Sequence, residues 1–272
     1  MQKNEELRFL FGENWNKFIR HHFSQERLEI SKNRILEFLE LDNLRNYNVL
    51  DVGSGSGLHS LAMLKAGANS VTSFDYDEKS VATTSFLAKE HGNQDWEVKQ
   101  GSVLDKNFMS TLPSYELVYS WGVLHHTGDV WTALDNVIKK VGRGGLLFIA
   151  LYSKDALVEK PEFWLNIKKK YNSGSVITRR CLEFWYVIKF ELGYNPLKLL
   201  DFLRNCWSYK HQRGMSKLID IRDWLGGWPM EFVGDMQTVA YLEKRGLELV
   251  KIKTGEANTE FLFRKVCLDA TE

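Results

Sequence analysis

The sequence has few cysteines, no excess of either charge and no long apolar run. Its three cysteines, Cys181, Cys206 and Cys267, are far apart and form no C-x-x-C pair, so neither a disulfide framework nor a zinc knuckle is indicated. Lysine and arginine total 36, and aspartate and glutamate total 35. This balance disfavours long nucleic acid as a partner, because proteins that bind it usually carry a basic excess.

Targeting and membrane-spanning patterns are missing as well. The first residues, MQKNEELRFLF, contain scattered charges and lack the apolar core of a signal peptide. The clearest apolar run, Leu146 to Tyr152, is much shorter than the ~20 residues that cross a bilayer. We therefore expect a cytoplasmic protein of a reducing compartment, without a membrane span.

The composition and the periodicity favour one α/β domain with insertions. Of the 272 residues, 44% are apolar and 13% are aromatic, enough to bury a sizeable core. Short β-prone runs alternate with helical patterns, which predicts a parallel sheet with right-handed crossovers. The expected strands are 47–52, 70–75, 96–100, 116–120 and 145–152, and the expected helices between them are 58–66, 80–91 and 131–141.

Three further segments surround this alternation. Residues 1–46 have helical spacing and are expected to form a helical cover, with 47–153 as the core. Residues 154–232 are rich in aromatics at helical spacing and predict a helical insertion after the fifth strand. Residues 233–272 predict a helix and a closing pair of strands, 247–254 and 259–266. The expected sheet thus has seven strands, five parallel plus the closing pair, with helices on both faces.

A glycine-rich turn follows the first strand, in VLDVGSGSG. Gly53, Gly55 and Gly57 let the chain turn sharply and let a ligand lie against the backbone. The dinucleotide pattern G-x-G-x-x-G fails at its third glycine in both possible registers, so a pyrophosphate is not the expected ligand. Asp51 before the turn suits a ligand that carries an ammonium group.

A second acidic residue stands at the end of the second strand. Asp75 lies 20 residues after Gly55, where a carboxylate can accept hydrogen bonds from both hydroxyls of a ribose. An isolated aspartate at this place would be a simple turn residue. Together with the glycine turn, it predicts an adenosine-containing ligand.

These segments resemble the class I S-adenosylmethionine (SAM)-dependent methyltransferase superfamily. The matching segments are VLDVGSGSG, SFDYD, GSVLD and YSWGVLHHTGD, the last followed by Trp131. More narrowly, and with LGGWPMEF at Leu225 to Phe232, the chain is similar to the ubiquinone-biosynthesis-type (type 11/12) small-molecule methyltransferases. The resemblance implies a Rossmann-like α/β fold, SAM as cofactor and S-adenosylhomocysteine (SAH) as product.

The resemblance also implies a role for each matching position. The glycine turn would hold the cofactor backbone, Asp51 would attract its methionine end through water, and the end of the second strand would hold its ribose. Relatives often place an acid at Ser102 for the adenine amino group, so here the hydroxyl or Asp105 would take that contact. The implied cofactor-binding residues are Asp51, Gly53, Ser54, Gly55, Gly57, Asp75, Tyr76, Ser102, Val103, Trp121 and Gly122.

Two histidines directly follow the fourth strand, near the expected methyl group. His125 or His126 would serve as a base for a hydroxyl acceptor, or Leu-His-His would be a structural helix start. Asp129 would orient one of them or cap the next helix. There is no N-P-P-Y segment for amide or base nitrogens, and no cysteine near the fourth or fifth strand for a covalent route. No metal is expected, since acids are missing at the end of the fourth strand.

The insertion is where the acceptor would bind. We expect Arg222, Trp228 and Glu231 to contact it, near the turn LGGWP. The aromatics would either stack on a ring or a sugar face, or form a core of their own. The basic clusters 168–170 and 179–180 would either attract an anionic acceptor or form solvated helix faces.

The function predicted from these features is methyl transfer from SAM to a small-molecule acceptor, with O-methylation of a sugar, phenol, quinol or related hydroxyl favoured. An RNA-modifying methyltransferase and a non-catalytic SAM-binding protein are the alternatives. A nicotinamide dehydrogenase is disfavoured by the glycine pattern. No pattern indicates an oligomeric state.

Overall fold

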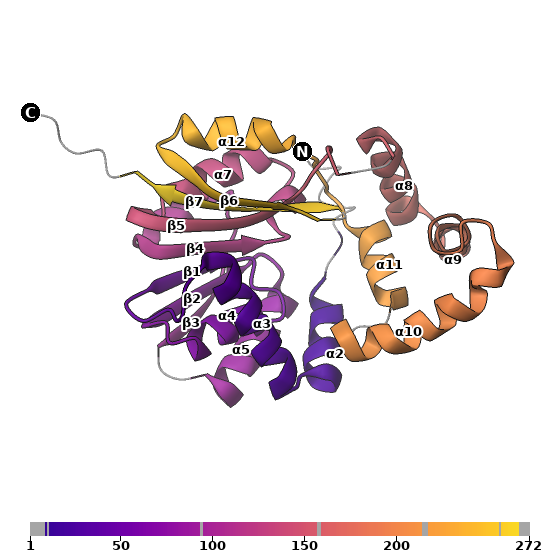
Figure 1. The fold of residues 1–272 in the computed structure, drawn as a ribbon, viewed down its shortest axis with the longest axis horizontal. Coiled ribbons are helices and arrows are strands. Elements are labelled where there is room, and N and C mark those ends of the chain that lie inside the picture. Colours follow the sequence, from indigo (N-terminus) through magenta and orange to yellow (C-terminus); the bar gives the residue numbers. More distant parts are fainter. Residues whose placement is uncertain are drawn as a thin grey trace, which may run out of the picture.

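The computed structural model describes residues 9, 11–92, 95–156, 159–213, 217–255 and 257–266. Seven strands form one sheet in the order β3-β2-β1-β4-β5-β7-β6 (Figure 1). Neighbours from β3 to β5 are parallel, whereas β7 runs antiparallel to both β5 and β6. The strands are β1 Asn48–Val52, β2 Ser70–Asp75, β3 Trp96–Gln100, β4 Tyr115–Trp121, β5 Val141–Tyr152, β6 Leu247–Thr254 and β7 Asn258–Lys265.

Helices cover both faces of the sheet, which explains why the central strands are almost continuously apolar. Val49, Leu50 and Val52 of β1 are all fully buried. One hydrophobic cluster joins one sheet face to α6 (Lys106–Thr111), α7 (Val130–Ile138) and α12 (Asp235–Glu243). A second cluster joins the other face to α2 (Gly12–His22), α3 (Gln25–Leu39), α4 (Leu58–Lys65) and α5 (Glu78–His91).

A chain of buried hydrogen bonds ties the first three strands together beneath the glycine turn. The indole N–H of Trp96 on β3 donates to Ser73 Oγ on β2 at 2.8 Å, and Ser73 donates to Ser60 Oγ on α4 at 2.8 Å. Ser60 in turn donates to the carboxylate of Asp51 on β1. All donors point the same way, so each bond polarises the next.

The insertion folds as a helical unit of its own. Trp164, Tyr171, Leu182, Ile221 and Leu225 form its buried centre. Figure 1 shows its helices gathered beyond one end of the sheet, with α2 beside α11. They are α8 Pro161–Ser173, α9 Val176–Tyr186, α10 Leu199–Arg213 and α11 Lys217–Gly226. No helix in the described part of the chain is long and apolar enough to cross a bilayer.

The structure confirms the predicted seven-stranded α/β fold and corrects some boundaries. The helix expected over 131–141 ends at Ile138, because Val141 already pairs with Tyr115 of β4. The fifth strand consequently starts four residues earlier than predicted, through a glycine-rich segment. Helix α6 was missed because its six residues are too few to show a period, although Asp105 caps it through the N–H groups of residues 107 and 108.

The buried hydrogen-bond chain predicts a stability cost for Ser73→Ala. The change leaves the buried Trp96 N–H without an acceptor, which should lower the unfolding free energy by about 1–3 kcal/mol. Urea denaturation followed by circular dichroism measures this difference. Ser110→Ala, which removes an exposed helical hydroxyl, is the matched control and should change stability by less than ~0.5 kcal/mol. Equal stabilities of the two variants would contradict the role of the chain.

Candidate active site

One cavity of about 1310 Å³ opens at the carboxyl ends of the parallel strands, where the strand order reverses between β1 and β4. Its wall includes residues 52–56 of the glycine turn, Asp75, residues 101–104 and Trp121, and it continues under α2 and α11. Gly57, which was also predicted to bind the cofactor, is buried and lies outside the wall. Pockets for one small ligand usually measure roughly 300–1,000 Å³. The cavity is therefore large enough for two ligands side by side.

The glycines of the turn are needed for close approach as well as for backbone conformation. Gly53 has φ 79°, and a Cβ there would lie 2.3 Å from Val123 Cγ1 in the loop after β4. Gly55 has φ 54°, and a Cβ there would lie 3.1 Å from the indole nitrogen of Trp15 on α2. Gly122 has φ 77° and faces open space at the cavity wall.

Asp75 is fixed at the cavity wall by backbone donors. Its Oδ2 accepts the N–H of Gly55 and its Oδ1 the N–H of Asp77, both at 2.9 Å. Burial raises the pKa of Asp75 to about 6. Asp75 lines the cavity, and a carboxylate there can accept hydroxyls of a ribose, so these residues fit the predicted adenosine ligand.

The residues predicted to flank the adenine also lie on the wall. Tyr76, Ser102 and Val103 all line the cavity. Ser102 Oγ accepts the N–H of Leu104 at 3.2 Å, which turns the loop after β3. Asp105 caps α6 and is outside the cavity wall, so the position expected to bind the adenine amino group offers a hydroxyl rather than an acid.

Asp51 occupies a different place from the predicted one. It is 2% exposed, accepts the Ser60 hydroxyl and does not line the cavity. Burial raises its pKa to about 7. Its predicted attraction for the methionine end is not supported by this position, because the carboxylate lies beneath the turn.

At the end of β4 the structure joins the predicted Trp121 with polar side chains that the sequence did not single out. Trp121 donates its indole N–H to Glu260 Oε1 on β7 at 2.7 Å, and both line the cavity. Tyr119 and His59 also line it, with Tyr119 Oη 2.9 Å from His59 Nδ1. The alternation of β4 places Tyr119 and Trp121 on one face, a signal that was available in the sequence.

The two neighbouring histidines have different environments. His125 is fully buried off the cavity wall, its Nδ1 accepts the N–H of Tyr152 at 3.3 Å, and burial holds its pKa well below the usual value. Such a histidine is neutral and structural. His126 lines the cavity, and its Nδ1 donates to the carbonyl of Pro229 at 2.8 Å. In neutral His126 the basic lone pair therefore lies on Nε2.

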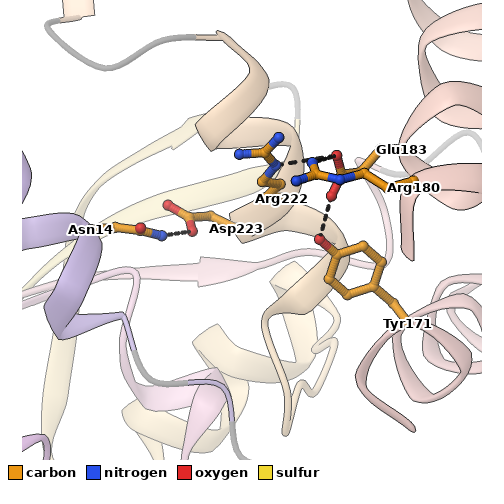
Figure 2. Close-up of polar contacts among 6 residues, drawn as sticks. All are labelled: Asn14, Tyr171, Arg180, Glu183, Arg222 and Asp223. Atoms are coloured by element: carbon orange, nitrogen blue, oxygen red, sulfur yellow. Dashed lines mark hydrogen bonds and ion pairs between the residues drawn. The ribbon is translucent and has the colours of Figure 1, made fainter. Parts of the chain in front are cut away.

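Of the three predicted acceptor residues, only Trp228 lines the cavity. Figure 2 shows Arg222 pointing toward α9, where its Nε lies 3.2 Å from Glu183 Oε2. Glu231 accepts the N–H of Val130 at 2.9 Å and so satisfies the start of α7. The predicted acceptor contacts of Arg222 and Glu231 are not supported, because both hold helices together instead.

Figure 2 also shows that Asp223, next to Arg222, points the opposite way, toward the N-terminal helix. Asn14 Nδ2 on α2 donates to Asp223 Oδ1 at 2.6 Å, and the N–H of Phe9 donates to the carbonyl of Trp228 at 2.9 Å. Burial raises the pKa of Asp223 to about 7. The N-terminal segment and the insertion thus meet over the cavity, a contact that no local sequence pattern reveals.

The basic clusters of the insertion do not line the cavity. Lys168 is fully buried, donates to the carbonyl of Trp224 and has its Nζ 4.4 Å from that ring. Arg179 binds backbone carbonyls of α8, and Arg180 lies 2.7 Å from Glu183. These side chains stabilise the insertion.

Charges of both signs line the cavity wall. Beside α3 and β6 the basic side chains Arg27, Arg34, Lys251 and Lys253 lie on the wall together with Glu37 and Glu260. Under the insertion, Glu191 pairs with Lys217, and both line the cavity.

A family model described as a methyltransferase domain matches residues 20–223. The chain belongs to this methyltransferase family. A ubiquinone biosynthesis O-methyltransferase of Agrobacterium fabrum is 29% identical over 139 residues, 49% of this chain and 54% of that protein. A tRNA U34 carboxymethyltransferase of Methylococcus capsulatus is 40% identical over 83 residues, 30% of this chain and 25% of that protein. The chain thus spans about half or less of these curated relatives.

Solved methyltransferases share the fold. An O-methyltransferase family protein from Burkholderia thailandensis aligns with a TM-score of 0.56 at 11% identity, over 89% of this chain and 58% of that one. Magnesium protoporphyrin IX methyltransferase from Synechocystis PCC 6803, solved with bound SAH, aligns with a TM-score of 0.52 at 14% identity, over 88% and 83%. Together with the family match, this confirms the predicted class I SAM-dependent methyltransferase, its fold and SAM as its cofactor.

The close approach at the methyltransferase turn predicts that Gly53→Ala weakens cofactor binding. The new Cβ meets Val123, so the turn must shift, and SAH affinity should fall at least ~10-fold given the cost of a non-glycine residue at positive φ plus the clash. Isothermal titration calorimetry with SAH measures this.

Gly246→Ala is the matched control for Gly53→Ala. Gly246 has the same φ of 79°, and a Cβ there meets nothing within 4 Å. This variant should lose a similar amount of backbone stability and bind SAH normally. Wild-type affinity in Gly53→Ala would show that the turn tolerates the shift.

The raised pKa of Asp51 predicts a pH effect on stability. Because the folded pKa of about 7 exceeds the ordinary aspartate pKa of 3.8, the folded state holds a proton that the unfolded state releases, and stability falls as pH rises between these values. Asp51→Asn should remove about 3 kcal/mol of the fall between pH 5 and pH 8, because about two pH units of this range lie below the folded pKa and each corresponds to 1.36 kcal/mol. Urea unfolding at pH 5 and pH 8 checks it. Parallel pH profiles of variant and wild type would rule the effect out.

Proposed function

We propose that this chain catalyses methyl transfer from SAM to a hydroxyl group of a small molecule held beneath the insertion. The observation that carries the proposal is that one continuous cavity joins the turn at Gly53 to His126 and to the aromatic side chains of α11. An acceptor enclosed there would lie beside the methionine end of the cofactor, close to Trp121 and Gly122. The partial likeness of the chain to ubiquinone biosynthesis O-methyltransferases is compatible with a hydroxyl acceptor.

The residues of the cavity wall would have different roles according to their positions. Asp75 and the turn would bind the cofactor, and Ser102 and Val103 would border its adenine. When bound, SAM supplies an activated methyl group that a nucleophile can take by in-line displacement. The enclosing helices exclude water and hold the acceptor oxygen in line, which is the main requirement of such a reaction.

His126 is the residue we propose as base. Its Nδ1 is bound to the Pro229 carbonyl, so the ring orientation is fixed and Nε2 can take a proton from a hydroxyl. The wall position of His126, in contrast to the buried His125, is what distinguishes the two histidines. The proton would pass from the acceptor oxygen to Nε2 as that oxygen takes the methyl group, and the electron pair of the broken sulfur–carbon bond would stay on SAH.

The test uses methyl-labelled SAM and an extract of the source cells that contains both small molecules and RNA, with labelled products identified by mass spectrometry. Wild-type protein should label a product whose new methyl group is on oxygen. His126→Gln keeps a donor for Pro229 and loses the base, so the rate should fall roughly 10²–10⁴-fold while SAH affinity stays within about twofold.

His91→Gln, at a histidine outside the cavity wall, is the control and should label at the wild-type rate. An unchanged rate in His126→Gln would assign the base elsewhere. SAH binding without any labelled product would instead contradict the enzymatic proposal and favour a non-catalytic SAM-binding protein. A labelled RNA would favour the RNA-modifying alternative.

A further inference from the structure

The part of the cavity beneath the insertion contains stacking faces and polar groups together. We call it the lid chamber and define it by Tyr152, Trp164, Tyr186, Phe190, Asp223, Trp224 and Trp228, all of which line the cavity. The ring of Trp224 meets those of Trp164 and Tyr152 nearly edge-on, with centroids 5.0 and 5.3 Å apart. Flat apolar faces and ring edges therefore alternate along its wall.

Two hydrogen-bond donors in this wall lack an acceptor. The indole N–H groups of Trp224 and Trp228 are buried and have no hydrogen-bond partner within the described residues. Trp228 is only 7% exposed. Leaving a buried N–H unpaired is costly, so buried N–H groups in native proteins are usually hydrogen-bonded. Where the chain itself offers no acceptor, a bound water or ligand can supply one.

Hydrogen-bond acceptors also line the lid chamber. Asp223 uses Oδ1 for Asn14, whereas its other carboxylate oxygen receives no hydrogen bond from a described residue. Burial, with the negative charge of Asp220 nearby, raises the pKa of Asp223 to about 7. The hydroxyl of Tyr152 likewise has no hydrogen-bond partner in the described ranges and can donate or accept.

This combination discriminates between classes of ligand. A cation would satisfy Asp223 and leave both indole donors unpaired, and an anion would satisfy the donors and be repelled by Asp223. A hydroxyl both donates and accepts, so several hydroxyls on one ring can satisfy all of these groups. A saturated ring with apolar C–H faces can in addition pack against the aromatic walls.

We infer that the lid chamber binds a hydroxyl-rich saturated ring, so that the acceptor is a saccharide or a closely similar polyol. The inference rests on the proposed function, of which it specifies the acceptor class. The ring hydroxyls donate to Asp223 and accept from Trp224 and Trp228, and the ring packs against the aromatic faces. One hydroxyl is thereby held beside His126 and the methionine end of the cofactor.

The experiment measures ligand binding to the SAH-loaded protein by saturation-transfer NMR and titration. The probes are the methyl glycosides of glucose, galactose, mannose, fucose and rhamnose, with catechol and tetramethylammonium for comparison. At least one glycoside should bind, and Trp224→Phe and Trp228→Phe should each weaken it ~3- to 10-fold, because phenylalanine keeps the ring and removes the donor.

Trp131→Phe is the matched control, since Trp131 packs on Tyr241 outside the cavity wall and should leave glycoside binding unchanged. Thermal unfolding of each variant verifies its fold. The inference is overturned if no glycoside binds, if both indole variants bind glycosides like the wild type, or if catechol or tetramethylammonium binds instead. SAH binding is measured in the same samples. Loss of SAH binding would count against the proposed function, whereas SAH binding without glycoside binding would count only against the inference about the lid chamber.

Discussion

Where β1 and β4 end at the cavity, there is no room for a side chain at Gly53. The backbone at Gly53 lies against Val123, and even a methyl group there would overlap it. Most other features of the site follow from this contact. It brings the turn to the end of β4, sets Gly122 against open space and leaves the N–H of Gly55 directed at Asp75. The turn is therefore rigid because it is packed on both sides, by Val123 and by Trp15.

The sequence predicted those features that depend on local pattern. The sheet could be predicted because each strand carries its own apolar run. The candidate cofactor region could be predicted because Gly53, Gly55 and Asp75 occupy fixed places relative to those strands. The short helix α6 could not be predicted, because it is too short to show a helical period. It is stabilised by the Asp105 cap and by Met109 in the core.

Side-chain direction was the harder part of the site. Adjacent residues such as Arg222 and Asp223, or His125 and His126, differ completely in what they face, and only the packing of neighbouring helices decides it. Asp51 shows the same limit, since its carboxylate was expected at the ligand and lies beneath the turn instead.

The bond between Asn14 and Asp223 joins residues 209 positions apart in the chain. On a ribosome that adds roughly 5–20 residues per second, the N-terminal helix is made about 10–40 s before its partner exists. During that interval α2 can pack only on the nascent strand-and-helix region, through contacts such as Gly12 with Asp77. The contact that closes the chamber can form only after Asp223 has emerged, so a translation product that stops before residue 223 lacks it.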